Sequence, residues 1–265
     1  MARARKRHVQ QELRFPDKNG QRRGRRVGDK TKNKPGRKPT IKGRPGSPHT
    51  ARPELNGRHP VHVVLRVHGD VGSLRKRHMY KALREATLAV AKRELFDAKV
   101  GAFRIVHVSI QRTHVHLLVE AEGKVALSRG MQSFQISAAK HINREYSIRA
   151  GLAERRRGVV FPDRFHQEII TSPTQARHTL SYVLNNWRKH EEDRAPRADS
   201  WNVDPFSTGA LFPGWKEHAH EPLLWKWRDT YDPLVVYRPR TWLLREGWMR
   251  GGGAISFHEV PRSRK

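Results

Sequence analysis

The way apolar residues repeat between residues 59 and 190 limits the possible folds of this chain more than any other feature of the sequence. Val61, Val63 and Leu65 alternate with the largely polar residues between them, which is the period of a β-strand. Over roughly 73–95 the spacing changes to three or four residues, which predicts an amphipathic helix. The segment is therefore expected to begin with a strand followed by a helix.

Five further elements are predicted from patterns of the same kind. Two strand-like runs, at about 103–110 and 114–120, are separated by three residues, a length suited to a hairpin. A second helix is predicted over roughly 125–148, a last strand near 164–170 and a last helix from 173 to about 190. The order strand–helix–strand–strand–helix–strand–helix is the split ferredoxin-like arrangement with one helix added. We therefore predict an α+β, ferredoxin-like or RRM-like fold, with a mainly antiparallel sheet and helices on one face.

The net charge indicates the class of partner. The chain has 54 Lys and Arg residues against 25 Asp and Glu residues, a formal net charge of +29. A positive charge this large favours a polyanion, usually nucleic acid, but does not separate DNA from RNA or an enzyme from a binding protein. The charge is +15 in residues 1–58, +13 in residues 59–190 and +1 in residues 191–265, so we divide the chain at these boundaries.

Residues 1–58 differ in composition from the rest of the chain. They contain thirteen Gly and Pro residues, and Phe15 is their only aromatic residue. Such a segment cannot bury enough apolar surface to offset the entropy of ordering its backbone, so we predict a disordered basic N-terminal arm. The arm would follow the phosphates of a nucleic acid, and the alternative is a leader that only solubilises the chain.

Other classes of protein are excluded by what the sequence lacks. Without cysteine the chain has no disulfide framework, thiolate zinc site or thiol nucleophile. No apolar run approaches the roughly 18 residues of a membrane helix, and the N-terminus shows no apolar signal segment. We expect a soluble cytoplasmic protein, associated with the nucleoid through its charge and not with a membrane.

His114 and His116 form the first candidate site. Side chains alternate along a strand, so both imidazoles project from one face while Val115 and Leu117 point to the other, into the core. Two imidazoles on one strand face can hold a divalent metal ion and leave positions open for phosphate oxygens. The alternative is a polar sheet surface that happens to carry two of the chain's 16 histidines.

The predicted helix at 173–190 carries the second candidate site. Tyr182 and Asn186 lie four residues apart, on a stripe turned away from the apolar side of the helix. A phenol beside a metal-bound phosphate can be a nucleophile, and the amide oxygen of Asn186 could complete the metal's ligand set. With His114 and His116, these groups would let Tyr182 attack a phosphodiester in line and keep the strand covalently attached. The alternative is a surface tyrosine on an amphipathic helix.

Basic residues beside the predicted cleft are candidates for contacts to DNA phosphates. They occur at the start of the first helix, in the loop before the last strand and in the last helix. They are Arg75, Lys76, Arg77, Arg155, Arg156, Arg157 and Lys189. Contacts of this type are largely blind to base sequence, and the alternative for each residue is solvated surface.

Four other polar residues of the predicted strands are left out of the metal site. His62 could share its surface if the first strand neighbours the third, but a structural hydrogen bond is favoured because no spacing ties it to His114. His107 and Glu120 are interpreted in the same way. Glu168 is interpreted as an exposed strand carboxylate.

Residues 191–265 carry six of the seven tryptophans, with Gly and Pro spread throughout. This composition predicts an irregular extension that packs over the preceding domain. Its tryptophans could stack on bases, but anchoring of a loop-rich segment is the favoured interpretation.

A strand with the sequence His-Val-His, followed about 65 residues later by a helical Tyr with Asn four positions on, resembles the single-tyrosine HUH transposases. The resemblance is in particular to the REP-associated tyrosine transposases, of the IS200-like group, and extends over roughly 59–190. Four stretches are similar to sequences of that family. They are residues 59–66, Met131-Gln132, Arg164-Phe165-His166 and residues 181–186.

The resemblance implies a single-stranded, hairpin-forming DNA substrate, a Mg²⁺ or Mn²⁺ ion and a 5′-phosphotyrosine intermediate. It implies His114, His116 and Asn186 as metal ligands and Tyr182 as nucleophile. Our leading hypothesis is a DNA strand transferase whose catalytic domain is 59–190. The alternatives are a metal-dependent nuclease that hydrolyses DNA, with a structural Tyr182, and a catalytically silent nucleic-acid-binding protein. The sequence does not distinguish a monomer from a homodimer.

Overall fold

The structure is a computed structural model that describes residues 52–96, 102–195, 198, 201–219 and 232–261. Contacts divide the chain into residues 1–39 and residues 40–265, and every described residue belongs to the second unit. The predicted basic arm therefore lies outside the described residues, apart from residues 52–58.

Residues 52–58 already pack against the folded domain. Leu55 is buried in the main core, and the guanidinium carbon of Arg52 lies 3.4 Å from the ring centroid of Phe165. Arg52 also donates a hydrogen bond to the Phe165 carbonyl oxygen at 3.1 Å. The folded part thus begins before residue 59, the boundary that the charge distribution predicts.

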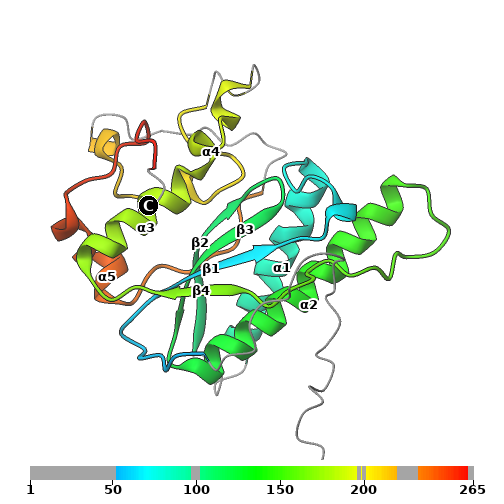
Figure 1. Cartoon of the computed structure of the whole chain (residues 1–265), viewed down its shortest axis with the longest axis horizontal. Helices are drawn as coiled ribbons and strands as arrows, with labels where there is room; N and C mark the ends of the chain where they lie inside the picture. Colours follow the sequence, from blue (N-terminus) through cyan, green and yellow to red (C-terminus); the bar gives the residue numbers. More distant parts are fainter. Residues whose placement is uncertain (1–51, 97–101, 196–197, 199–200, 220–231, 262–265) are drawn as a thin grey trace, which may run out of the picture. The chain divides into compact units, whose positions relative to one another are not determined.

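Four antiparallel strands form one sheet in the order β2-β3-β1-β4 (Figure 1). They are β1 (Val61–Arg66), β2 (Phe103–Ile110), β3 (His114–Ala121) and β4 (His166–Ile169). These bounds match the four strands predicted from the sequence, including the hairpin of β2 and β3. The strand order is that of the split ferredoxin-like arrangement, so the predicted α+β class is confirmed.

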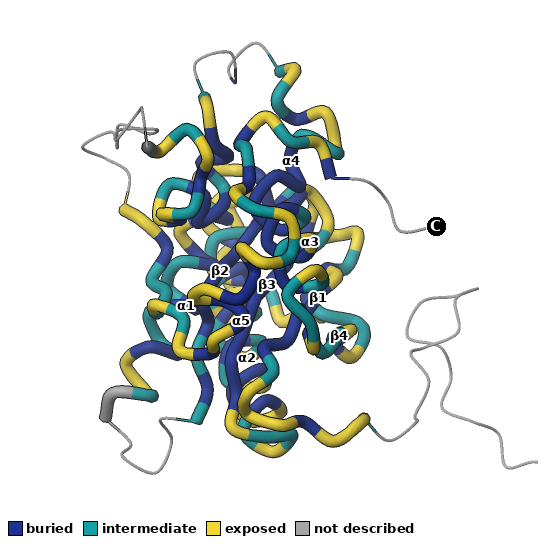
Figure 2. Tube along the Cα trace, turned by 90° about the vertical axis from the view of Figure 1, so that its left-hand side faces the viewer, coloured by how far each residue is buried: buried dark blue, intermediate teal, exposed yellow. Residues whose placement is uncertain are grey.

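Two helices cover one face of the sheet, as the sequence predicts. They are α1 (Arg77–Phe96) and α2 (Lys124–Arg149), which lie together behind the strands (Figure 1). Leu83 of α1 and Phe134 of α2 join Val63 of β1 in the main hydrophobic core. Figure 2 shows how deeply the central strands are buried between their covering layers.

The last predicted helix is the exception, because it lies on the opposite face of the sheet. In α3 (Pro173–Leu184), Leu180 and Val183 pack with Leu118 of β3 and Val106 of β2 in a second core cluster. Val106 lies at an irregularity in the β2–β3 pairing, a bulge that interrupts the alternation of the strand. Val106 and Leu118 form an apolar patch on this face of the sheet, and α3 covers the patch.

The ends of α3 agree only partly with the prediction. At its start the helix begins at residue 173 as predicted, and the hydroxyl of Ser172 caps it by accepting a hydrogen bond from the backbone N–H of Gln175 at 3.3 Å. At its end the helix stops at Leu184, because Asn185 has φ −102° and ψ 14°. A separate short helix follows, α4 (Asn186–Lys189). The predicted single helix to residue 190 is therefore broken.

The described part of the C-terminal extension consists of turns and short helices. Its α-helix is α5 (Trp242–Arg245), and its 3-10 helices are Glu192–Arg194, Gly209–Leu211, Lys216–Ala219 and Gly247–Gly251. A further 3-10 helix, Gly69–Val71, follows β1. None of the helices that the structure describes combines the length and apolar character needed to span a membrane.

The tryptophans of the extension do not share one environment. Trp215 and Trp248 are buried beside α3 in the second core cluster, which agrees with an anchoring role. Trp242 is 45% exposed instead. Trp225 and Trp227 lie outside the described residues.

Candidate active site

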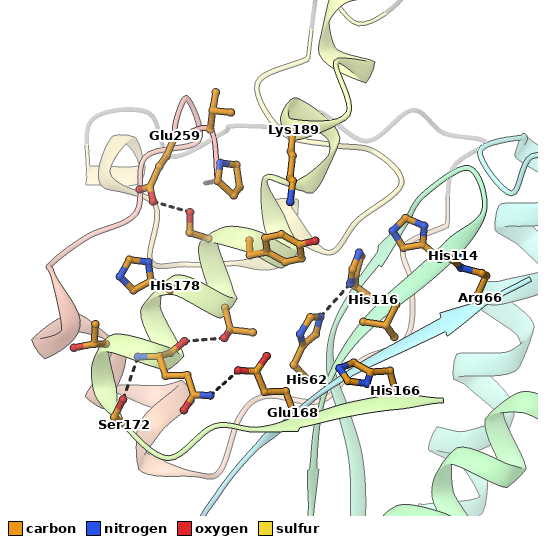
Figure 3. A pocket seen from close by; sticks show the side chains of 18 residues that line it. His62, Arg66, His114, His116, His166, Glu168, Ser172, His178, Lys189 and Glu259 are labelled. Atoms are coloured by element: carbon orange, nitrogen blue, oxygen red, sulfur yellow. Dashed lines mark hydrogen bonds between the residues drawn. The ribbon is translucent and has the colours of Figure 1, made fainter. Parts of the chain in front are cut away.

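The side chains of the candidate site gather on the sheet face opposite α1 and α2. Strands β1 and β3 pair so that Val64 lies across from His116, and Arg66 lies across from His114. Because alternate residues of a strand share a face, His62 projects from this face as well. Figure 3 shows these side chains around one pocket, which we call the His–Tyr pocket.

His62 and His116 form a buried pair. Nε2 of His62 lies 3.0 Å from Nδ1 of His116, and the two rings stack with centroids 5.2 Å apart (Figure 3). Nε2 of His116 is buried and has no hydrogen-bond partner in the described part of the chain. When Nδ1 of His116 is the donor in this pair, its Nε2 carries a lone pair that can bind a metal ion. His62 thus has the structural hydrogen bond that the sequence analysis favoured, and it lies on the candidate surface too.

Both predicted metal-ligating histidines are held in the neutral form. Burial, together with the nearby His190 and Arg66, lowers the pKa of His114 to about 4. Burial and the neighbouring His62 lower the pKa of His116 well below its usual value. Neutral imidazole is the form that binds metal ions, so both rings are ready as ligands near pH 7. His190, with its ring centroid 5.7 Å from that of His114, was missed because it lies beyond the strand motif.

Tyr182 lies on α3 next to these histidines. Its ring centroid is 5.4 Å from that of His116 and 5.9 Å from that of His62. Nζ of Lys189 is 4.7 Å from the centroid of the same ring, a cation–π distance. The helical phenol and the strand imidazoles, which lie more than sixty residues apart in the sequence, therefore meet in one pocket.

Asn186 does not line the pocket and is fully buried. The helix break after Leu184 places it at the start of α4, so it does not continue the stripe of Tyr182 along one helix. Its Oδ1 and Nδ2 both lack a hydrogen-bond partner among the described residues. A buried amide without partners is costly, and a cation beside Oδ1 would remove part of that cost.

Three of the predicted groups have the chemistry to bind a divalent metal ion. These are the imidazoles of His114 and His116 and the amide oxygen of Asn186, a nitrogen and oxygen set that leaves positions open for phosphate oxygens. Nε2 of His116 and Oδ1 of Asn186 are buried and unpaired within the described ranges. No group of three His, Cys, Asp or Glu side chains is placed to hold a metal in those ranges.

The His–Tyr pocket has a volume of about 1270 Å³. Pockets for small ligands usually measure about 300–1,000 Å³, so this one has room for a segment of a nucleic-acid strand. His166 and Glu168 of β4 and His178 of α3 line another part of it (Figure 3). Glu168 is half-buried, not exposed as predicted, and it accepts a hydrogen bond from the side chain of Gln175 at 3.0 Å.

Among the predicted phosphate contacts, Lys189 lines the His–Tyr pocket. The other six residues do not line it. Lys76 and Arg77 are exposed at the start of α1, while Arg155 and Arg157 are exposed in the loop before β4. Arg156 is held by a 2.6 Å hydrogen bond to the side-chain oxygen of Asn143 in α2. Arg66 does line the pocket, and the strand period that placed His62 could have identified it.

Arg75 is buried, so it is not placed to contact a DNA phosphate as the sequence predicts. Its side chain is 3% exposed and forms two hydrogen bonds of 2.8 Å with the carboxylate of Asp204. It also donates to the Ile110 carbonyl oxygen at 3.0 Å, and its guanidinium lies over the ring of Phe206. Arg75 therefore links the domain to the C-terminal extension through a buried ion pair with Asp204.

The net charge of +29 favours a polyanionic partner, and the His–Tyr pocket lies on one face of the sheet of an α+β domain. Residues 58–186 match the family model described as transposase IS200 like, and the domain that they form belongs to this family. Its members are DNA-binding, DNA-cleaving enzymes that generally use a divalent metal ion.

A solved structure described as a REP-associated tyrosine transposase bound to a REP hairpin is similar to this chain. The similarity covers 73% of this chain and 99% of that chain, with 20% sequence identity and a TM-score of 0.43. No curated protein gives a significant match.

Proposed function

We propose that this chain is a transposase that cleaves and rejoins single-stranded, hairpin-containing DNA, with Tyr182 as its nucleophile. The observation that supports the proposal most directly is the 5.4 Å distance between the ring centroids of Tyr182 and His116. Both residues lie in the domain that matches the transposase family, and both line the His–Tyr pocket.

In the proposed reaction, the phenolic oxygen of Tyr182 attacks the phosphorus atom of one phosphodiester. A bond forms between this oxygen and phosphorus, and the bond between phosphorus and the 3′ oxygen breaks. The phenolic proton passes to solvent, the departing 3′ oxygen takes up a proton, and the strand stays attached as a 5′-phosphotyrosine. A 3′-hydroxyl can then attack this linkage, release Tyr182 and rejoin the strand without another energy source.

Basic side chains of the pocket support this chemistry. The ammonium group of Lys189 lies next to the ring of Tyr182, where its positive charge would stabilise negative charge on the phenolic oxygen and on the phosphate. Arg66 reaches the pocket from the sheet side, where it can pair with a phosphate. Phosphoryl transfer depends mainly on position and electrostatics, so a small set of residues is sufficient.

His114, His116 and Asn186 are the residues that would hold a metal ion, for which we propose Mg²⁺ or Mn²⁺. Such an ion would supply charge neutralisation on the phosphate oxygens. The protein's own contribution is to present neutral imidazoles and a buried amide oxygen with no competing partner in the described part of the chain.

A covalent adduct is the decisive test. Labelled single-stranded hairpin DNA is incubated with the protein and Mn²⁺, denatured in SDS and separated on a gel. We expect a shifted protein–DNA band that disappears in Tyr182→Phe. The matched control is Tyr146→Phe, which removes a hydroxyl from α2 on the other side of the sheet and should leave the adduct intact.

The same gel separates the alternatives. Strand cleavage that survives Tyr182→Phe, with no adduct in either protein, would show a hydrolytic nuclease. A mobility shift on a native gel, with neither cleavage nor adduct on the denaturing gel, would show a catalytically silent binding protein. Either result contradicts the proposed strand transferase.

A further inference from the structure

A second pocket lies beside the turn between β4 and α3. It has a volume of about 580 Å³ and is lined in part by Arg58, Arg240 and Trp242, so we call it the Trp242 pocket. Successive residues of the turn face the two pockets in alternation. Ser172 and Thr174 line the His–Tyr pocket, whereas Thr171 and Pro173 line the Trp242 pocket. The two pockets therefore border on the same stretch of chain, residues 171–174.

The lining of the Trp242 pocket is basic. Arg58 and Arg240 are exposed, and no acidic side chain is among the described residues that line it. Arg104 also lines it and is paired with the buried carboxylate of Glu120 at 3.1 Å. Two exposed guanidinium groups around a hollow favour an anionic occupant, and phosphates are the anions that arginine binds in bidentate fashion.

Trp242 is held in a fixed position although it is exposed. The backbone N–H and the hydroxyl of Thr241 each donate to Glu120 at 2.8 Å, which fixes the chain just before it. Gly247 lies so close that an added Cβ would be 2.7 Å from the six-membered part of the indole. The guanidinium of Arg250 lies over the ring at 5.3 Å. These contacts restrain the indole from several sides, while 45% of the residue stays exposed.

We propose that the Trp242 pocket binds an unpaired DNA base. The base stacks on the indole of Trp242, and the phosphates on either side of it contact Arg58 and Arg240. Stacking on an aromatic side chain beside basic groups is how proteins hold single strands without reading their sequence. A paired base in a duplex has no free face to offer, so the occupant is single-stranded.

The proposal rests on the proposed function, because the strand in the Trp242 pocket is the one whose phosphate reaches Tyr182. The strand leaves the His–Tyr pocket across the turn at residues 171–174 and enters the Trp242 pocket on the other side. The enzyme therefore recognises nucleotides beyond the scissile phosphate, outside the reach of the histidines and the tyrosine.

The test measures binding of fluorescent single-stranded oligonucleotides to the full chain by anisotropy. One oligonucleotide is just long enough for the His–Tyr pocket, and the other extends several nucleotides further at either end. Trp242→Ala should weaken binding of the extended strand by about tenfold or more, with little effect on the short one. Trp242→Phe should retain most of the affinity, and Met249→Ala, an exposed apolar residue of the neighbouring 3-10 helix, should retain all of it.

A second variant covers the case in which Trp242→Ala does not fold. Arg58→Ala combined with Arg240→Ala should reduce the slope of log affinity against log salt by about 1.4, roughly 0.7 for each lost phosphate contact. Lys92→Ala with Arg93→Ala is the control pair, because both are exposed on α1 across the sheet.

Two results would overturn the proposal. One is an extended strand that binds Trp242→Ala as tightly as the unchanged protein, and the other is an equal loss for the short and the extended strand. Failure of the proposed function is a separate observation, since it appears as a missing covalent adduct with unchanged protein. The stacking site stands if the adduct is missing while the extended strand still depends on Trp242.

Discussion

Replacement of His62 by Leu should weaken metal binding although His62 is not one of the proposed ligands. In the structure its Nε2 lies 3.0 Å from Nδ1 of His116. When Nδ1 of His116 is the donor in this pair, the lone pair of His62 holds the proton there and leaves Nε2 of His116 free for a metal ion. Leu cannot accept this proton. His116 then either leaves a buried N–H unpaired or moves its proton to Nε2, and the second tautomer cannot be a ligand.

The size of the effect follows from the burial of the pair. His62 and His116 are 8% and 3% exposed, so water does not replace the lost acceptor. A neutral hydrogen bond contributes about 0.5–1.5 kcal/mol, and a donor left unpaired in the interior costs about 1–3 kcal/mol. Losing the residue that orients a metal-binding histidine typically lowers metal affinity by about 10–100-fold, or about 1.4–2.7 kcal/mol, which lies in the same range.

Titration calorimetry with Mn²⁺ on the full chain measures this effect without reference to activity. His62→Gln should bind nearly as well as the unchanged protein, because its amide oxygen can accept from Nδ1 of His116. His166→Leu is the control, since His166 is exposed and lines the same pocket from the edge strand β4. The reasoning is refuted if His62→Leu binds Mn²⁺ with unchanged affinity, or if His166→Leu weakens binding as much.

Three other perturbations test the fold and the site. Arg75→Ala should lower the free energy of unfolding in urea by about 3–5 kcal/mol, because the buried carboxylate of Asp204 loses its counter-ion. Lys76→Ala on the exposed surface should change the free energy of unfolding by less than about 0.5 kcal/mol. Burial lowers the pKa of His107 to about 4, so between pH 6.5 and 4 the unfolded chain binds a proton that the folded chain does not, and stability falls as the pH falls. His107→Asn should remove about 2–3 kcal/mol of the loss between pH 7 and 4.5, and an unchanged pH dependence would contradict this. Lys189→Ala should slow adduct formation about tenfold in a single-turnover assay, and Lys189→Arg should largely restore the rate. Equal rates for the unchanged protein and both variants would show that this charge has no part in the reaction.

Short-range sequence patterns were sufficient to predict most of the fold and part of the candidate site. Each strand and helix has its own period, so the elements that hold His114, His116 and Tyr182 could be predicted from short windows. What the windows could not show is which strands are neighbours. The sheet order places β1 beside β3, and only this pairing brings His62 to His116. The favoured hydrogen bond of His62 was therefore predicted without its partner.

The burial of Arg75 depends on a contact with a residue that is distant in the sequence, so it could not be predicted from local patterns. Arg75 lies in a basic run that is typical of exposed surface, but its partner Asp204 follows 129 residues later. No local signal connects them, because the pair forms only when the C-terminal extension folds back on the domain. Asn185, where the helix breaks, also contacts that extension, because its side chain donates to the carbonyl oxygen of Ser256 at 3.0 Å.

The position of Tyr182 is a property of the whole folded chain and not of the family-matched segment alone. On its sheet side, α3 has an apolar patch to pack on, but its outer side is held by the last residues that the structure describes. Arg177 of α3 forms a 2.9 Å ion pair with Glu259. Gly251 packs so closely on the backbone of Pro173 that any side chain there would collide with it. The extension thus packs against the first turns of α3 on the side away from the sheet. The helix that bears Tyr182 is therefore held in place by the sheet on one side and by the extension on the other.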